Sequence, residues 1–217
     1  MKKLFFIAVF AALSMTSLFA ATPTLEIIGD KIQDVTVNGK TYKFDGEIKE
    51  IAGAKVMAFG AKPLAVPAKT LVGEKGTIVM EYAIDTKNSK SAARPLMCLR
   101  LDDPKQIAFF TFHGNPVIQL RFGNPVFADK KIKLTANKIH QSAVTWDGEK
   151  IAFYLDGKLL KEMKQPVAVN PKYIANLTVG PFKDQYFVTP TWDNDCFMKS
   201  LRVYNEALSA KDIANLK

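Results

Sequence analysis

The chain of 217 residues is basic, with 30 Lys and Arg against 21 Asp and Glu. Such a balance raises nucleic acid, anionic polysaccharide or an acidic envelope surface as partners. Four of these cations are arginine, and base and phosphate recognition favours the forked guanidinium. The lysines stand singly along alternating stretches. We therefore exclude nucleic acid and interpret the lysines as a solubilising face, with an anionic glycan partner as the alternative.

The first 20 residues have the pattern of a bacterial secretory signal peptide. Lys2 and Lys3 precede an apolar run that ends in small residues. We expect cleavage after Ala20, which would leave residues 21–217 as an exported chain, periplasmic or secreted. An uncleaved anchor is the alternative, although the apolar run is shorter than the ~20 residues that cross a bilayer comfortably. The mature chain is expected to contain no transmembrane segment.

Short apolar or alternating runs, separated by turn residues, predict strands along most of the chain. The predicted strands cover residues 24–28, 33–37, 40–44, 54–60, 63–67, 77–84, 96–101, 107–112, 117–122, 132–134, 143–146, 151–155, 176–180 and 197–204. Two polar segments, 85–94 and 181–195, are predicted loops, and residues 205–213 have the pattern of a turn and a capped short helix. This order predicts an all-β sandwich or barrel, and its length suits a single domain over residues 21–217.

The most informative motif is the hairpin within residues 140–157, HQSAVTWDGEKIAFYLDG. Its two strand-length runs are β-branched and aromatic, and Asp147-Gly148 and Asp156-Gly157 tolerate the positive φ of tight turns. Together with the strand 197–204 and the helix after it, this hairpin resembles the laminin G-like domains of the concanavalin A-like lectin/glucanase superfamily. The resemblance implies a jelly-roll β-sandwich of two antiparallel sheets with a short C-terminal helix.

Trp192 is the main candidate for contact with a ligand, because it lies in a polar, turn-rich loop rather than in an alternating strand. An exposed indole can stack on a sugar ring while its neighbours Asp193 and Asn194 accept hydrogen bonds from hydroxyl groups. The alternative is that Trp192 folds back as a lid over the sheet edge. Trp146, in contrast, falls in a core-facing alternation and is predicted to pack in the core.

Two kinds of catalytic site can be compared with the sequence. A glucanase of this superfamily would need two carboxylates on one strand face, as in E-x-D-x-E, and this pattern does not occur. A polysaccharide lyase would need a His, a Tyr and an Arg or Gln, and the nearest approach is His140, Gln141 and Tyr154 on neighbouring predicted strands. The resemblance gives His140 a structural role instead, hydrogen-bonded near the turn.

Laminin G-like domains often bind calcium through an aspartate of their last strand, and the resemblance places Lys199 at that position. Because an ammonium group repels the ion, no cofactor is expected, although Asp193 and Asp195 in the preceding loop could form a substitute calcium site. No cysteine or histidine stands at the spacing of a transition-metal site. Cys98 and Cys196, the two cysteines, could form a disulfide in an exported chain or stay as buried thiols.

The resemblance implies a non-catalytic recognition module whose partner is carbohydrate. Two other functions stay open, because one fold hosts many functions. The chain could be an envelope structural or protein-binding module, whose partner would be an envelope or extracellular protein. It could also be a polysaccharide hydrolase or lyase, which the residue patterns above favour less.

Overall fold

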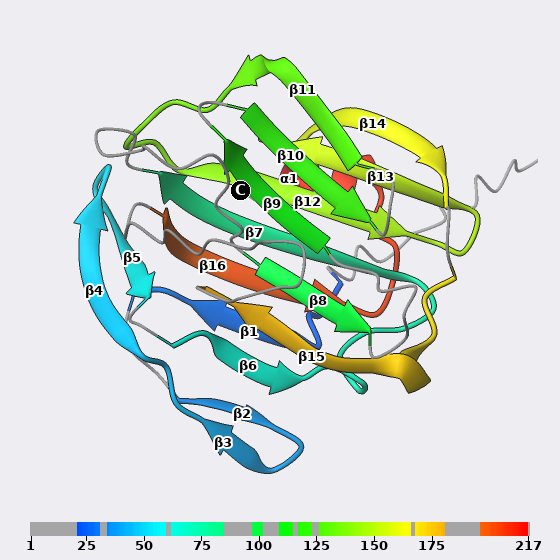
Figure 1. Ribbon diagram of the computed structural model, residues 1–217, viewed down its shortest axis with the longest axis horizontal. Coiled ribbons are helices and arrows are strands. Elements are labelled where there is room, and N and C mark those ends of the chain that lie inside the picture. Colours follow the sequence, from blue (N-terminus) through cyan, green and yellow to red (C-terminus); the bar gives the residue numbers. More distant parts are fainter. Residues whose placement is uncertain are drawn as a thin grey trace, which may run out of the picture.

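The computed structural model (Figure 1) describes residues 21–30, 34–59, 62–84, 97–101, 109–114, 117–122, 126–165, 168–180 and 196–216. Within these ranges the chain forms antiparallel β-sheets in two layers. The predicted signal peptide and the predicted loops 85–94 and 181–195 lie outside the described residues. In the described part, no helix is long and apolar enough to cross a membrane.

The larger layer is an eight-stranded sheet whose last strand in sequence lies in its middle. Its order is β14 (Lys158–Lys164), β13 (Lys150–Leu155), β12 (His140–Trp146), β7 (Gly76–Ile84), β16 (Cys196–Tyr204), β5 (Ala54–Phe59) and β4 (Gly46–Ile51). β1 (Leu25–Ile28) also pairs with β16, beside the residues that pair with β5. Strand β16 therefore has β7 along one edge and shares its other edge between β5 and β1.

The second layer consists of two three-stranded sheets. One contains β6 (Leu64–Pro67), β15 (Ile174–Val179) and β8 (Met97–Leu101), and the other contains β9 (Phe109–Gly114), β10 (Val117–Phe122) and β11 (Val126–Lys133). In Figure 1 they lie in front of the large sheet, with β8 next to β9. A separate hairpin of β2 (Val35–Val37) and β3 (Lys40–Tyr42) projects below them. The predicted jelly-roll sandwich of two antiparallel layers is confirmed.

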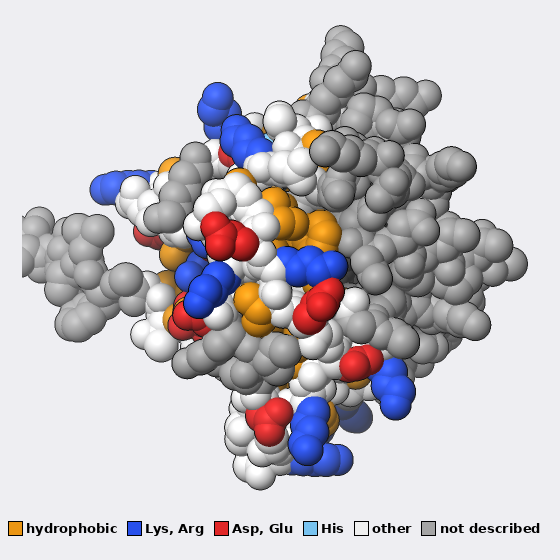
Figure 2. Space-filling model, turned by 90° about the vertical axis from the view of Figure 1, so that its left-hand side faces the viewer, with side chains coloured by type: hydrophobic (Ala, Val, Ile, Leu, Met, Phe, Trp, Pro, Cys, Tyr) orange, Lys and Arg blue, Asp and Glu red, His pale blue; other side chains and the backbone are white. Residues whose placement is uncertain are grey.

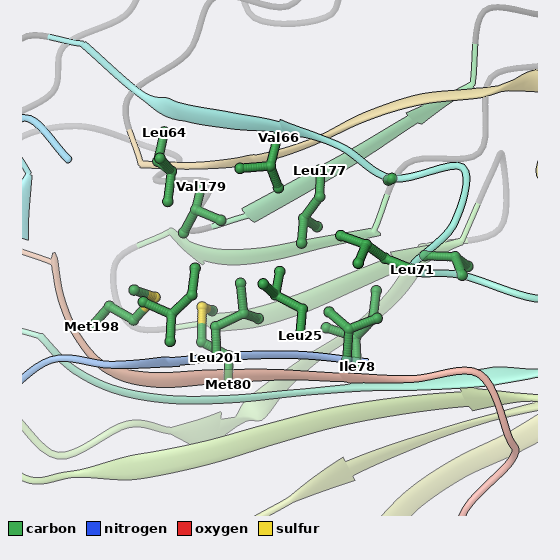
Figure 3. Packing of buried hydrophobic residues seen from close by; sticks show 14 of the residues in the cluster. Leu25, Leu64, Val66, Leu71, Ile78, Met80, Leu177, Val179, Met198 and Leu201 are labelled. Carbon is green, nitrogen blue, oxygen red and sulfur yellow. The ribbon is translucent and has the colours of Figure 1, made fainter. Parts of the chain in front are cut away.

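The hydrophobic core lies between the two layers, because side chains alternate between the two faces of each strand. We call the side of the large sheet that faces the second layer its inner face, and the opposite side its outer face. Ile78 and Met80 on β7 and Leu201 on β16 belong to the inner face and are almost fully buried. Figure 3 shows them opposite Val66 of β6 and Leu177 of β15. The second layer thus covers the inner face with apolar side chains.

Trp146, at the end of β12, packs in this core as predicted. Its side chain is fully buried, and its indole Nε1 donates a hydrogen bond to the carbonyl oxygen of Gly73 at 3.2 Å. The ring lies directly against Gly76, where a Cβ atom would collide with it. A glycine at position 76 therefore makes room for the indole, and Trp146 is not available to a ligand.

The C-terminal helix α1 (Ala210–Asn215) covers part of the outer face. It begins after Ser209, whose side chain and that of Asp212 form a capping box, so the predicted turn and capped helix are confirmed. Leu208 and Ile213 pack against Val79 and Tyr204, which point outward from β7 and β16. The helix therefore shields a small apolar cluster on a face that would otherwise meet water.

Two strands of the large sheet, β4 and β14, were not predicted, and both are edge strands. Every residue of β14 is exposed or half-buried, and three of its seven residues are lysine. β4 is likewise exposed or half-buried throughout. Charged residues on edge strands oppose pairing with other chains, but they also remove the apolar alternation that identifies a strand in a sequence.

The charged surface is mixed rather than of one sign. Figure 2 shows the left-hand side of the molecule, where Lys and Arg side chains are interspersed with Asp and Glu side chains over the described residues. Lys49 on β4, for example, pairs with Glu47 at 2.8 Å. Both side chains are exposed, as the interpretation of a solubilising face requires.

Candidate functional site

The loop predicted to carry the binding site, with Trp192, Asp193, Asn194 and the substitute calcium ligand Asp195, lies outside the described residues. The structure defines where this loop starts and ends. It leaves β15 after Gly180 in the second layer and enters β16 at Cys196 in the large sheet. Gly180 has a φ of +99° and lies against the ring of Phe59 on β5, where a Cβ atom would collide. The described chain therefore ends in one layer at Gly180 and resumes in the other at Cys196. The side chains of Cys98 and Cys196 also lie outside the described part, so their pairing stays a prediction.

His140 has the structural role that the sequence resemblance implied. Its side chain is buried, and its Nδ1 lies 3.0 Å from Oδ2 of Asp156. Its Nε2 lies 3.1 Å from the backbone nitrogen of Thr135 and 3.2 Å from the carbonyl oxygen of the same residue. Oδ1 of Asp156 also accepts from the backbone N–H of Gln141. One ring nitrogen thus links the start of β12 to the turn after β13, and the other links it to Thr135 in the segment before β12.

His140, Gln141 and Tyr154, the nearest approach to a lyase arrangement in the sequence, do not share one face of the sheet. Tyr154 pairs directly with Ala143 and belongs to the outer-face cluster under α1. His140 lies on the opposite face, beside Tyr82 of the core, at 6.3 Å between ring centroids. Because neighbours along a strand alternate, Gln141 faces outward with Tyr154 while His140 faces inward. The sheet itself separates the histidine from the tyrosine.

A polar cluster lies on the outer face of the large sheet. We call it the outer-face polar cluster, and its members are Glu26, Glu81, Lys199, Ser200 and Arg202. Glu81, on the central strand β7, accepts hydrogen bonds from Lys199 Nζ at 2.8 Å and from Ser200 Oγ at 2.7 Å. Arg202 donates from Nε to Glu26 at 2.7 Å, and its Nη1 lies 3.6 Å from Glu81. An irregularity in β16 between Met198 and Ser200 brings both Lys199 and Ser200 to this side.

The electrostatics of the cluster favour paired charges rather than proton transfer. Burial raises the pKa of Glu81, but the hydrogen bonds from Lys199 and Ser200 and the nearby cations outweigh it, so the pKa lies below its usual value. Glu81 is therefore ionised near neutral pH and cannot serve as a general acid there. Lys199, which stands where related domains carry a calcium-binding aspartate, is held by Glu81. Among the described residues, no group of three His, Cys, Asp or Glu could hold a metal ion.

Gln141 borders this cluster and is unusual. It lies directly opposite Glu81 in the pairing of β12 with β7, and its side chain is buried. Among the described residues, neither its Nε2 nor its Oε1 has a hydrogen-bond partner. An unpaired buried carboxamide is destabilising, because the group loses its hydrogen bonds to water without replacing them. The outer face thus contains both well-paired charges and an amide without partners.

A pocket lies at the end of the β13–β14 pair, and sequence reasoning missed it because β14 was not predicted. Its volume is about 520 Å³, and its lining residues are Gly148, Glu149, Lys150, Glu162, Met163, Lys164 and Gln165. The signal that could have revealed it is Asp156-Gly157, a tight turn that requires a strand after it as well as before it. We call this cavity the hairpin pocket.

The chain resembles several solved structures of carbohydrate-related proteins. Domain 4 of AbnA, a GH43 extracellular arabinanase from Geobacillus stearothermophilus in complex with arabinotriose, is 13% identical with a TM-score of 0.63 over 91% of this chain and 98% of that one. The CBM40 of the Ruminococcus gnavus IT-sialidase, bound to α2,3 sialyllactose, is 15% identical with a TM-score of 0.57, over 90% and 99%. A Trypanosoma rangeli sialidase, a covalent intermediate with 2,3-difluorosialic acid, is 14% identical with a TM-score of 0.64, over 91% of this chain.

The chain spans 32% of that sialidase chain, so this match covers part of a larger protein. At these identities the three structures establish the fold alone. No curated protein matches the chain by sequence. A family model described as the concanavalin A-like lectin/glucanases superfamily matches residues 69–214, which include the central strands and the helix. The chain therefore belongs to the concanavalin A-like lectin/glucanases superfamily.

Proposed function

We propose that the protein is an exported, non-catalytic recognition module that binds carbohydrate. The observation that carries the proposal is the extent of the structural matches. The chain covers 98% of an arabinanase domain with bound arabinotriose and 99% of a carbohydrate-binding module with bound sialyllactose. It covers only about a third of the sialidase chains, such as 29% of one in complex with sialic acid. Its size and fold therefore correspond to whole binding modules.

The two carboxylates of the outer-face polar cluster support binding rather than hydrolysis. A glycosidase needs one carboxylic acid that is protonated near its working pH and a second carboxylate that acts on the sugar. Glu81 is held ionised by Lys199 and Ser200, and Glu26 is engaged by Arg202. With His140 and Tyr154 on opposite faces, the lyase alternative loses its residues as well.

Within this proposal, Trp192 contacts the sugar and Asp193 and Asn194 accept hydrogen bonds from its hydroxyl groups. They belong to the predicted loop 181–195, which follows β15 of the second layer and precedes β16 of the large sheet in the sequence. An indole in such a connection can cover the apolar C–H face of a sugar ring. The same loop contains Asp195, so a calcium ion that involves Asp193 and Asp195 would make binding dependent on calcium.

The test is a glycan-array scan of the chain from Ala21 onward, performed with calcium and again with a chelator. We expect saturable binding to particular glycans and at least tenfold weaker binding for Trp192→Ala. Tyr173→Ala is the matched control, because Tyr173 is an exposed aromatic residue near β15 and its removal is expected to leave binding unchanged. Silence of the wild-type protein in both conditions would contradict the proposal and favour an envelope structural or protein-binding module.

Export belongs to the same proposal, and its support is the pattern of the first 20 residues. Expression of the full chain in a bacterium, followed by cell fractionation and mass spectrometry, tests it. We expect the protein in the periplasm or the medium, with Ala21 as its first residue. A cytoplasmic product that retains Met1 would contradict export.

A further inference from the structure

We propose that the hairpin pocket is a binding site for an uncharged sugar residue. This inference rests on the proposed carbohydrate-binding function and adds to the contact proposed at Trp192 a second sugar site with a stated ligand class. The pocket is formed by the turn between β12 and β13, by the last residues of β14 and by Gln165 after that strand. Its volume of about 520 Å³ lies within the range of about 300–1,000 Å³ that small-molecule sites occupy.

The turn that forms one side of the pocket is held in a fixed conformation. Oδ1 of Asp147 accepts hydrogen bonds from the backbone N–H groups of Glu149 at 2.8 Å and Lys150 at 2.7 Å. The hydrogen bond from Lys150 has the larger effect and that from Glu149 the smaller, and together they hold the pKa of Asp147 below its usual value. The carboxylate is therefore ionised at neutral pH and keeps accepting both bonds. Gly148 has a φ of +98°, a conformation that favours glycine.

Gln165 fixes the other side of the pocket to this turn. Its Oε1 accepts a hydrogen bond from the backbone N–H of Gly148 at 2.9 Å. Its own backbone N–H donates to the carbonyl oxygen of Glu149 at 2.7 Å. Gln165 is 8% exposed, so this two-point link joins a buried residue to the exposed turn. The walls of the pocket are therefore formed before any ligand arrives, which lowers the entropy cost of binding.

The charged groups of the pocket suit a ligand without net charge. Its lining contains two carboxylates, Glu149 and Glu162, and two ammonium groups, Lys150 and Lys164. The charges therefore cancel, and neither an anion nor a cation gains a net attraction. Sugar hydroxyl groups both donate and accept hydrogen bonds, so one ring can satisfy carboxylates and ammonium groups together.

The remaining lining supplies apolar contact and access. Met163 is half-buried, and the lysine side chains add methylene groups beside their charged ends. β14 is the last strand in the order of the sheet, so the pocket lies at the sheet edge. Lys150 Nζ and Glu162 Oε1, 2.9 Å apart, form an ion pair between exposed side chains. A solvent-exposed ion pair is weak, so the ammonium and carboxylate groups can separate and form hydrogen bonds with ligand hydroxyl groups instead.

The test compares two double variants in calorimetric titrations with oligosaccharides. The neutral probes are cellotetraose, xylotetraose and arabinotriose, and the anionic probes are tetragalacturonate and sialyllactose. We expect a neutral probe to bind, and Lys150→Ala/Glu162→Ala to bind it at least tenfold more weakly. Lys49→Ala/Glu47→Ala is the matched control, because it removes an exposed Lys–Glu pair from β4 at the other edge of the sheet. This control is expected to bind like the wild type.

Each outcome separates this inference from the proposed function. Neutral-probe binding that is unchanged in Lys150→Ala/Glu162→Ala but lost in Trp192→Ala would overturn the hairpin pocket and leave the carbohydrate-binding function standing. Binding of anionic probes alone would overturn the ligand class. Absence of binding by the wild type to these probes and to the glycan array would overturn both. NMR provides a measurement that needs no variants. When the wild-type protein is titrated with a neutral probe, we expect the amide signals of Gly148 and Lys150 to shift and the amide signal of Lys49 to stay in place.

Discussion

The two faces of the large sheet are made from the same strands but are stabilised in different ways. The inner face presents mainly apolar side chains to the second layer, and Ile78, Met80 and Leu201 there are almost fully buried. The outer face is divided. An apolar cluster lies under α1, a second surrounds Phe197 and Ala83, and the outer-face polar cluster also lies on this face.

The difference shows how much of the stability depends on what covers each face. The inner face buries hydrocarbon against hydrocarbon, so nearly every side chain contributes through the removal of apolar surface from water. On the outer face, Glu81 is buried only because Lys199, Ser200 and Arg202 compensate its charge. Gln141, beside it, has no such compensation. Substitutions on the two faces should therefore change the free energy of unfolding by different amounts, and in one case in the opposite direction.

The largest effect is expected on the inner face. Leu201→Ala would remove a fully buried side chain that lies between the layers in Figure 3. We expect it to lower the free energy of unfolding by about 2–5 kcal/mol, because it leaves a cavity in a packed core. Urea denaturation measures the change. Leu159→Ala is the control, since Leu159 is 52% exposed on β14, and its effect should stay within about 0.5 kcal/mol. Equal effects of the two variants would contradict the contrast.

An intermediate effect is expected for the polar cluster. Glu81→Gln would leave Lys199 and Arg202 without a buried carboxylate, so we expect the free energy of unfolding to fall by about 1–3 kcal/mol at pH 7. Glu47→Gln is the control, because Glu47 is 67% exposed and pairs with Lys49 in water. Its effect should stay below about 0.5 kcal/mol.

The pH dependence sharpens this prediction. Burial raises the pKa of Glu81, but Lys199 and Ser200 lower it more, and the net pKa lies below the ordinary value of 4.5. A depressed carboxyl pKa stabilises the folded state fully above the unfolded pKa, and the contribution disappears as the pH falls through the folded pKa. The difference between wild type and Glu81→Gln should therefore shrink between pH 5 and pH 2. A constant difference over that range would contradict the assignment of the shift to Glu81.

The smallest effect, of opposite sign, is expected at Gln141. Gln141→Met keeps the length of the side chain and removes a carboxamide that has no partner, so we expect stability to rise by about 1 kcal/mol. Gln165→Met is the matched control. Gln165 is also buried, but its Oε1 accepts from Gly148, so the same change should destabilise by about 1 kcal/mol. Thermal and urea unfolding measure both. Destabilisation by Gln141→Met would show that the amide is satisfied in solution.

The sequence predicted the architecture well, because the central strands carry strong local signals. Trp146 was correctly assigned to the core from alternation alone, and the pattern of residues 205–213 predicted the capped helix. The edge strands β4 and β14 were missed because exposed, charged edges lack that alternation. The hairpin pocket was missed with them, because Glu162 and Gln165 can be placed next to the turn between β12 and β13 only when β14 is known.

The assignment of faces needed the strand register, which residue types do not supply. His140, Gln141 and Tyr154 lie close in the sequence pattern, but the pairing of Ala143 with Tyr154 places the tyrosine on the outer face. A shift of one residue would have exchanged the two faces. The predicted ligand residues Trp192, Asp193 and Asn194 stay predictions, because they lie in the loop outside the described residues.

The position of β16 also has a consequence for the order of synthesis. β1, at the start of the described chain, pairs with β16, and the β4–β5 hairpin joins the large sheet through β16 as well. A nascent chain that still lacks Cys196–Tyr204 therefore has nowhere in this sheet to attach its first strands. Native pairing on that side must wait until Cys196–Tyr204 is available. Pairing between such distant segments is slow, so the newly made chain stays open for longer than a fold built from local contacts.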